Sequence, residues 1–185
     1  MKLYYTGADA FEDVQNDKDK SLGGFQSSTL IPNDLVNNFF GDISMYSLDE
    51  KLRETRGFIF LNDSGSALTN FYIHFDKGVG ALGTFEVAAV SITPNSAGEV
   101  FMESISNIRA TPYAGDFVEA DGVANKQLLS ASFASGDYIG IWLRRSLTDG
   151  DKSQFDCDTL EENFTADPKV PIVIDGNVDV VFSWD

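Results

Sequence analysis

The stretch GDYIGIWLRRSL, residues 136–147, has the composition of a buried strand, and two adjacent arginines stand near its end. Successive side chains of a strand point to opposite faces, so Arg144 and Arg145 are expected on opposite sides of a sheet, with at least one meeting a carboxylate. That carboxylate could belong to the same chain or to a neighbouring molecule. We take the intermolecular contact as the working hypothesis, because a formal net charge of -16 would repel identical copies unless a cationic point offsets it.

No set of residues in the sequence has the pattern of a catalytic site. His74 is the only histidine, and nucleophilic catalysis needs a nucleophile, a base and an orienting group brought together. Cys157 is the only cysteine, which excludes an internal disulfide and the usual cysteine-based zinc sites. We therefore predict no enzymatic activity, no catalytic residues and no cofactor.

Two acidic stretches, TDGDKSQFDCD and QNDKDKS, place carboxylates at alternate positions, as calcium loops do. Asp149, Asp151, Asp156 and Asp158 lack the glycine and the terminal glutamate of an EF-hand loop. Solvated turns are the favoured interpretation, and no metal site is predicted. The glycines of SLGGF, residues 21–25, do not follow a phosphate-binding pattern either.

Aromatic side chains offer one candidate binding surface. Tyr138 and Trp142 share one face of their predicted strand, and together with Tyr72 they could form a platform for a sugar. The alternative, which we favour, is that this face is the second buried face of a central strand.

Between residues 56 and 146 the sequence consists of short apolar or alternating runs separated by turn residues, which predicts strand after strand. NFYIHFD alternates strictly, and NVDVVFSWD near the C-terminus predicts a final strand. Turns in place of helices between strands favour an all-β fold, an antiparallel two-sheet sandwich of jelly-roll type. Eight residues are expected in its core: Phe58, Phe60, Ile73, Phe75, Val87, Ile139, Ile141 and Val180.

We expect one domain, with an N-terminal strand and extended arm or cover at residues 1–55 and the sandwich core at residues 56–185. Two short helices are predicted, at residues 33–41 and 158–168. Elsewhere in residues 6–55 the apolar residues follow neither strand nor helix period, so the segment is either an arm packed on something or an irregular cover over one end of the sandwich. Four of its side chains are expected at an interface, sheltered by a neighbour: Phe25, Ile31, Phe39 and Phe40.

The charge balance limits the partners. With 29 acidic against 13 basic residues, the field of the protein repels phosphate and anionic lipid, so no nucleic-acid or membrane partner is expected. The longest apolar runs are far shorter than the roughly 20 residues of a membrane-spanning helix. The opening MKLYYTGAD has no apolar secretory segment, so we expect the protein to be made in a cytoplasm.

Four blocks of sequence resemble a group of small structural proteins of tailed bacteriophages. They are SLGGFQSST, NNFFGDIS, ETRGFIFLND and GDYIGIWLRR, and their order and rough spacing match. The version with DISMYSLDEK is most similar to proteins of the crAss-like phages of gut bacteria. The likeness covers about residues 20–146, and the tail from residue 153 to 185 has no counterpart.

The resemblance implies a virion component of the tail, neck or head-fibre apparatus, made in the cytoplasm of the host bacterium. Such a protein acts by assembly with other virion structural proteins, as a homo-oligomer or ring, and has no active site. A second class of function stays open, a receptor- or glycan-binding module displayed on the virion. The two differ in that an adaptor buries large surfaces on several partners, whereas a binding module leaves an aromatic groove open.

Overall fold

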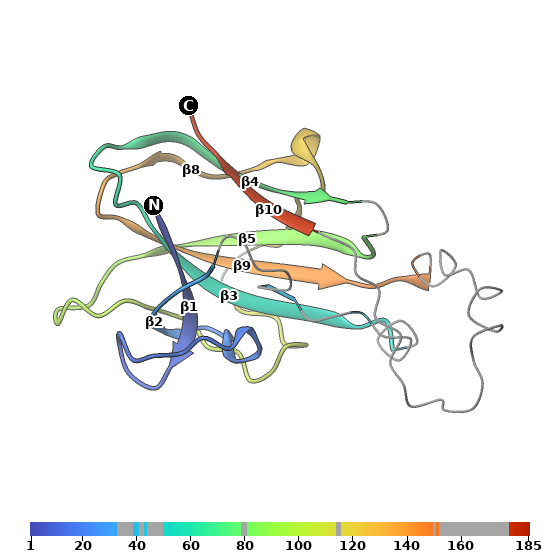
Figure 1. Cartoon of the computed structure of the whole chain (residues 1–185), viewed down its shortest axis with the longest axis horizontal. Coiled ribbons are helices and arrows are strands. Elements are labelled where there is room, and N and C mark those ends of the chain that lie inside the picture. The colour runs from blue at the N-terminus through green and yellow to red at the C-terminus, as the bar shows by residue number, and fades with distance from the viewer. Residues whose placement is uncertain are drawn as a thin grey trace.

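The computed structural model describes residues 1–32, 39–40, 43, 50–78, 81–113, 116–149, 151 and 178–185. These residues form two antiparallel sheets that curl into a half-barrel (Figure 1), which confirms the predicted all-β fold. The strands are β1 (Lys2–Ala8), β2 (Gly24–Leu30), β3 (Arg53–Leu61), β4 (Leu68–Lys77), β5 (Thr84–Ile92), β6 (Phe101–Met102), β7 (Val118–Glu119), β8 (Gln127–Phe133), β9 (Tyr138–Ser146) and β10 (Val178–Ser183).

Two single 3-10 turns, η1 (Lys18–Lys20) and η2 (Val123–Asn125), are the named helical elements of the described residues, and Asp149 and Asp151 also have helical backbone. The helix predicted at 33–41 falls mostly outside the described residues, and the one at 158–168 lies entirely outside them. No helix of the described part is long and apolar enough to cross a membrane.

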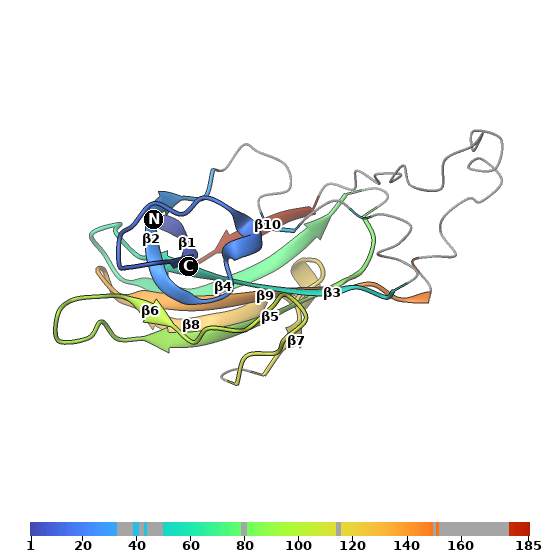
Figure 2. The same ribbon diagram turned by 90° about the horizontal axis from the view of Figure 1, so that it is seen from below.

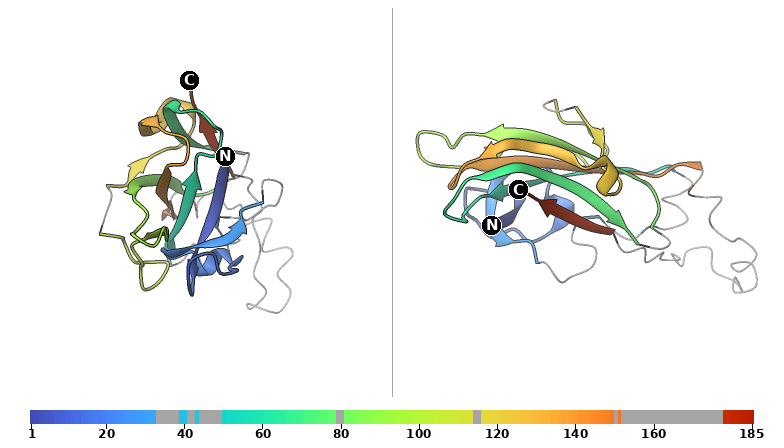
Figure 3. Two further views of the ribbon diagram at one scale, coloured as in Figure 1. Left: turned by 90° about the vertical axis from the view of Figure 1, so that its left-hand side faces the viewer. Right: turned by 90° about the horizontal axis from the view of Figure 1, so that it is seen from above.

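The larger sheet has seven strands in the order β6-β2-β1-β3-β9-β5-β7, and the smaller has three in the order β10-β4-β8. The long strands β3, β9 and β5 form the middle of the larger sheet, and β4 is the middle of the smaller one. In Figure 2, seen from below, the N-terminal strands in blue lie on the other side of β3 and β9 from β8. The end-on view in Figure 3 shows how the sheets curl around one another.

The core between the two sheets is rich in phenylalanine. Phe60, Phe71, Phe133 and Phe182 form one group of mutually packed rings, drawn from four different strands. Seven of the eight predicted core residues are buried, namely Phe58, Phe60, Ile73, Phe75, Val87, Ile139 and Ile141, and Val180 packs against this cluster partly buried. The alternation of apolar residues along the strands therefore identified the inward face correctly.

The middle of the larger sheet is buried on its other face as well. Trp142 lies there in a second cluster with Ile59, Val100 and Met102. Gly57 is the cross-strand partner of Trp142, and a Cβ on Gly57 would lie 2.8 Å from the indole carbon Cζ3. Only glycine leaves room for the flat face of the indole at this point of β3.

A short segment after β7 joins the two sheets. The N–H of Ala120 donates to the Phe85 carbonyl of β5 at 2.9 Å, and the Phe75 N–H of β4 donates to the Ala120 carbonyl at 2.8 Å. The carboxylate of Asp121 accepts from the Phe85 N–H at 3.0 Å. These bonds satisfy backbone groups of both sheets where they meet, so the gap between β4 and β5 is closed here by polar contacts.

The N-terminal region differs from the expected irregular arm. Residues 24–30 form strand β2, which pairs with β1 and β6 within the larger sheet. The hydrophobic pattern missed this strand because two of its buried side chains, Gln26 and Ser27, are polar. Ser27 accepts from the Gln15 N–H at 2.9 Å and donates to the Gln15 carbonyl at 2.8 Å, which makes burial of its hydroxyl tolerable. For residues 24–30 the expectation of an arm was therefore wrong.

Candidate interaction site

Arg144 is held by a carboxylate of its own chain. Its Nε and one terminal nitrogen donate to the two oxygens of Glu86, each at 2.7 Å, and β5–β9 register places these two residues directly opposite each other. The guanidinium also lies 3.8 Å from the ring centre of Phe117. The side chains of Arg144 and Glu86 are 13% and 23% exposed, so this is a partly desolvated, bidentate pair of the strong kind.

Arg145 points to the opposite face and meets Glu54, its cross-strand partner on β3. Glu54 also lies 3.4 Å from a terminal nitrogen of Arg56, which is hydrogen-bonded to Asp19 at 2.7 Å. Glu54, Arg56 and Arg145 are all buried. Phe40 covers this charged cluster, with its ring centre 5.1 Å from the Arg145 guanidinium.

The two arginines of the sequence hypothesis are thus both paired within the chain. The internal alternative is the one that the structure shows, and neither arginine needs an acidic neighbour from another molecule. Sequence reasoning missed Glu54 and Arg56, which together with Arg145 form the buried part of the cluster. The alternation in RETRG carried a signal, because residues 54 and 56 of a strand must share one face.

We expect Arg144→Ala to destabilise the isolated protein. The change removes two charge-assisted hydrogen bonds, leaves Glu86 unpaired and uncovers Phe117, so the free energy of unfolding should fall by about 1.5 to 3 kcal/mol. Urea unfolding of the purified protein measures this. The matched control is Arg109→Ala, since Arg109 lies 4.0 Å from Glu50 and their side chains are 55% and 45% exposed; its effect should stay within about 0.5 kcal/mol. Equal effects of the two changes would contradict the internal role of Arg144.

The sugar platform predicted as one alternative does not form. Trp142 is fully buried in a cluster that includes Val100 and Met102. Tyr138 is partly buried against the same cluster. A flat aromatic face has to be open to stack on a sugar ring, so the assignment of Tyr138 and Trp142 to glycan binding was wrong. The favoured alternative, a second buried face of a central strand, is confirmed.

The four apolar residues expected at an interface have contacts inside the chain. Ile31 and Phe40 are buried, and Phe40 packs on Phe85 with ring centres 5.8 Å apart. Phe39 meets Phe58 edge-to-face at 5.1 Å, and Phe25 meets Phe101 at 6.1 Å. Phe39 and Phe40 therefore cover part of the half-barrel's own core. These side chains therefore do not need a neighbouring molecule to shelter them from water.

The acidic stretch after β9 is used for local structure where it is described. One oxygen of Asp151 accepts from the Gly83 N–H at 2.7 Å, and the other accepts from the N–H and the hydroxyl of Thr148, both at 2.7 Å. Asp149 forms an exposed ion pair with Lys51. Within the described residues no group of three or more side chains could hold a metal ion, and Asp156 and Asp158 lie outside them.

Asp151 should make stability depend on acid pH. Burial of the carboxyl acts to raise its pKa, but the hydrogen bonds from Gly83 and Thr148 outweigh burial and hold the pKa below its ordinary value. A carboxyl with a lower pKa in the folded state stabilises at neutral pH, and this contribution is lost as the pH falls through the ordinary and then the folded pKa, below about pH 4. The free energy of unfolding measured from pH 7 to pH 3 should therefore fall less steeply for Asp151→Asn than for the unaltered protein. Parallel curves would show that Asp151 is not responsible.

His74 takes no part in a catalytic arrangement among the described residues. It is buried on the outer face of the smaller sheet, beside Val181 of β10. His74 is therefore a histidine packed on the face of a sheet.

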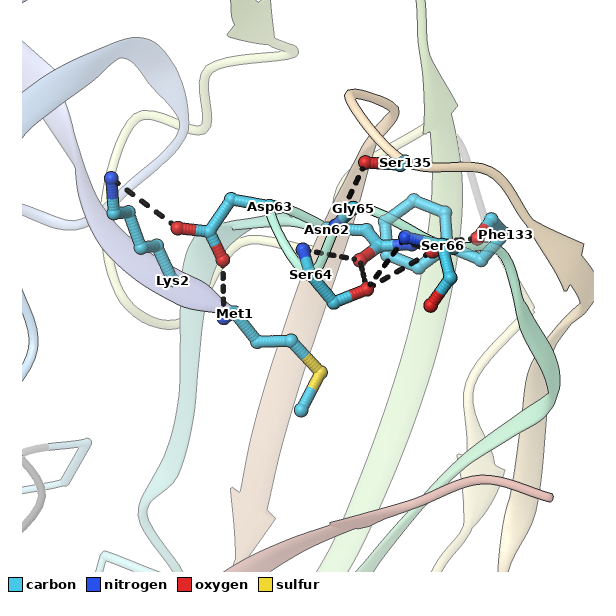
Figure 4. Close-up of polar contacts among 9 residues, drawn as sticks. All are labelled: Met1, Lys2, Asn62, Asp63, Ser64, Gly65, Ser66, Phe133 and Ser135. Carbon is cyan, nitrogen blue, oxygen red and sulfur yellow. Dashed lines mark hydrogen bonds and ion pairs between the residues drawn. The ribbon is translucent and has the colours of Figure 1, made fainter.

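The loop between β3 and β4 is organised by one buried asparagine (Figure 4). The Asn62 side-chain nitrogen donates to the carbonyls of Ser66 at 2.9 Å and Phe133 at 2.8 Å, and its oxygen accepts from the Ser64 N–H and hydroxyl. Next to it Asp63 pairs with the amino group of Met1, which is the main cause of the lowered pKa of Asp63. The cluster connects the loop to β8 and β1, and the side chains of Asn62 and Asp63 find their polar partners within the chain.

An open groove of about 420 Å³ lies beside β6 and the loop before β2. Its walls include the backbone of Gly7, Gly23 and Gly24 and the rings of Phe25 and Phe101. Gly23 has a φ of 82°, and a Cβ there would lie 1.7 Å from the Glu103 carbonyl oxygen, so the tight approach of the two loops requires glycine. The SLGGF block thus shapes a close backbone contact, and Phe101 is the half-exposed ring at the rim.

The surface that we name the β7–β8 edge consists of residues 118–133. Three of its apolar side chains stand in solvent: Val118 is 46% exposed, Val123 68% and Leu128 50%. The Gln127 side chain binds the carbonyls of Glu119 at 2.7 Å and Asn125 at 2.9 Å, which draws β7, η2 and the start of β8 together. Exposed apolar side chains beside an edge strand are candidates for contact with another protein.

No family model, no curated protein and no solved structure matches the chain.

Proposed function

We propose that the protein is a structural component of a bacteriophage virion, in its tail, neck or head-fibre apparatus, and that it acts by assembly with neighbouring subunits. The proposal starts from the likeness of four sequence blocks to phage structural proteins. The observation on the molecule that carries it is the β7–β8 edge, residues 118–133, which contains the seven-residue edge strand β8 and three exposed apolar side chains. Such a surface favours protein–protein contact.

The blocks that carry the likeness build the scaffold. ETRGFIFLND contains β3 and the Asn62 loop, GDYIGIWLRR contains most of β9, and these two strands pair over nine residues. SLGGFQSST supplies the glycine turn and β2. Three of the four blocks therefore lie in residues that build the larger sheet, which supports an assembly role, and NNFFGDIS lies mostly outside the described residues.

The alternative, a receptor- or glycan-binding module, has lost its main support. It depended on Tyr138 and Trp142 as an open aromatic platform, and Trp142 is buried. The open groove beside β6 has two aromatic rings, Phe25 and Phe101, and they meet edge-to-face and form no flat platform. Assembly is the function that we carry forward.

The test is quantitative mass spectrometry of purified particles of the phage that encodes the chain. We expect the protein to remain with the particles through density-gradient purification, at a constant copy number relative to the major capsid protein, as a symmetric assembly part requires. A protein that is abundant in infected cells and missing from purified particles would contradict the proposal.

A further inference from the structure

The sheet edges of the described part of the chain are protected to different degrees. Unpaired N–H and C=O groups make an edge strand a template for another chain, and proteins commonly block it with short strands, charges or proline. In the larger sheet the edge strands β6 and β7 have two residues each. In the smaller sheet β10 carries the exposed Asp179. β8 is seven residues long, reads QLLSASF and has no charge and no proline.

The outer side of β8 is open within the described residues. Its described ladder runs to β4 alone, from the pair Leu68–Phe133 to the pair Ile73–Gln127. Leu128, Ala131 and Ser132 are exposed along it. A further strand laid against β8 would satisfy its free backbone groups, extend the smaller sheet and cover Leu128, whose burial contributes about 25 cal/mol per Å² of apolar area.

The charge of the chain indicates whether the edge of β8 pairs with a second copy or with another protein. The chain has a formal net charge of -16. Three of its arginines form ion pairs with carboxylates of the same chain, namely Arg56, Arg144 and Arg145. They are therefore poor candidates for offsetting the repulsion between copies. Near the start of β8 Glu119 and Lys126 carry opposite charges, and the Asp121 carboxylate pairs with Lys77 at 3.2 Å, so the net negative charge of the whole chain distinguishes the two partners. A cationic segment gains from this field and a second acidic copy loses.

We propose that the outer edge of β8 binds an extended, cationic segment of another protein, which adds to the smaller sheet as a strand. The inference deepens the proposed assembly role and rests on it, since the segment would belong to another virion protein. Backbone pairing supplies the part of the binding that does not depend on sequence, and the net charge of -16 supplies the preference for lysine or arginine over glutamate or aspartate.

The test uses the full chain and two fluorescent peptides of seven residues, one alternating lysine with valine and one alternating glutamate with valine. Fluorescence anisotropy at low salt measures their dissociation constants. We expect the lysine peptide to bind about tenfold more tightly, and this preference to shrink as salt is added. Equal affinity for the two peptides, or binding of neither, would overturn the proposal.

A matched pair of variants locates the site. Ala131 is exposed on β8, so both Ala131→Lys and Ala131→Glu should leave the melting temperature unchanged. Ala131→Lys should weaken binding of the lysine peptide by about tenfold, whereas Ala131→Glu should preserve or strengthen it. Equal weakening by both variants, or by neither, would contradict a cationic partner at β8.

Analytical ultracentrifugation of the unaltered protein tests whether a second copy of the chain pairs with β8. A dimer that both Ala131 variants abolish would show that β8 pairs with a second copy, which would overturn the choice of partner. The outcomes for the proposed function are separate, because presence in purified particles does not depend on β8. A protein found in particles whose β8 fails the peptide test keeps its assembly role and loses this site.

Discussion

Glu54→Gln is expected to lower the free energy of unfolding by about 3 to 5 kcal/mol. Glu54 is buried between Arg145, its partner across β3 and β9, and Arg56, which it meets at 3.4 Å. The amide keeps the shape of the side chain and removes its charge, so two guanidinium groups are left with less negative charge in a site that water reaches poorly. Breaking a buried ion pair from one side costs this much because the remaining charge is uncompensated.

Urea unfolding of the purified protein provides the measurement. Glu50→Gln is the control, since Glu50 lies 4.0 Å from Arg109 on the surface, and its loss should change stability by less than about 0.5 kcal/mol. If Glu54→Gln were as mild as the control, the cluster would not be holding the ends of β3 and β9 together.

Ile141→Ala is expected to cost about 2 to 5 kcal/mol. Ile141 lies in the middle of β9, between Phe58 on β3 and Ala89 on β5, and is almost completely buried in the main core. Truncation removes apolar contacts and leaves a cavity that the paired strands on both sides cannot close. Chemical denaturation gives the difference directly.

Val14→Ala is the control for this change, because Val14 is 80% exposed and its truncation should cost little. A loss below about 1 kcal/mol for Ile141→Ala would mean that β9 is not the central strand of the larger sheet.

Short apolar runs bounded by turn residues, and the alternation in NFYIHFD, were enough to predict most of the long strands. Phe58, Phe60 and Ile141 were placed in the core from such runs, and all three are buried. The same rule failed for β2, where Gln26 and Ser27 are buried polar residues and the Ser27 hydroxyl is hydrogen-bonded to the backbone of Gln15. A method that reads apolar periodicity cannot detect a strand whose buried side is polar.

The partners of the arginines depended on register, which the sequence did not supply. A shift of β3 or β5 by one residue against β9 would turn Glu54 or Glu86 to the opposite face. The observed register places Glu54 opposite Arg145 and Glu86 opposite Arg144, so both cations find acids within the chain. Net charge alone could not distinguish these internal pairs from contacts with a neighbour.

The candidate site could be predicted only in part for a related reason. QLLSASF has the composition of a strand, but its position at an edge is a property of the topology β10-β4-β8. The exposed Val118 and Val123 come next to it through the hydrogen bonds of Gln127, which link segments with no shared periodicity. Strand order therefore had to be known before this surface could be recognised.

An electron cryomicroscopy reconstruction of the phage particle tests the assembly role most directly. We predict density for the half-barrel at symmetry-related positions in the tail, neck or head-fibre apparatus, with the β7–β8 edge covered by an extended segment of a neighbouring protein. A fully assigned particle in which no density fits the two sheets of this chain would contradict the account.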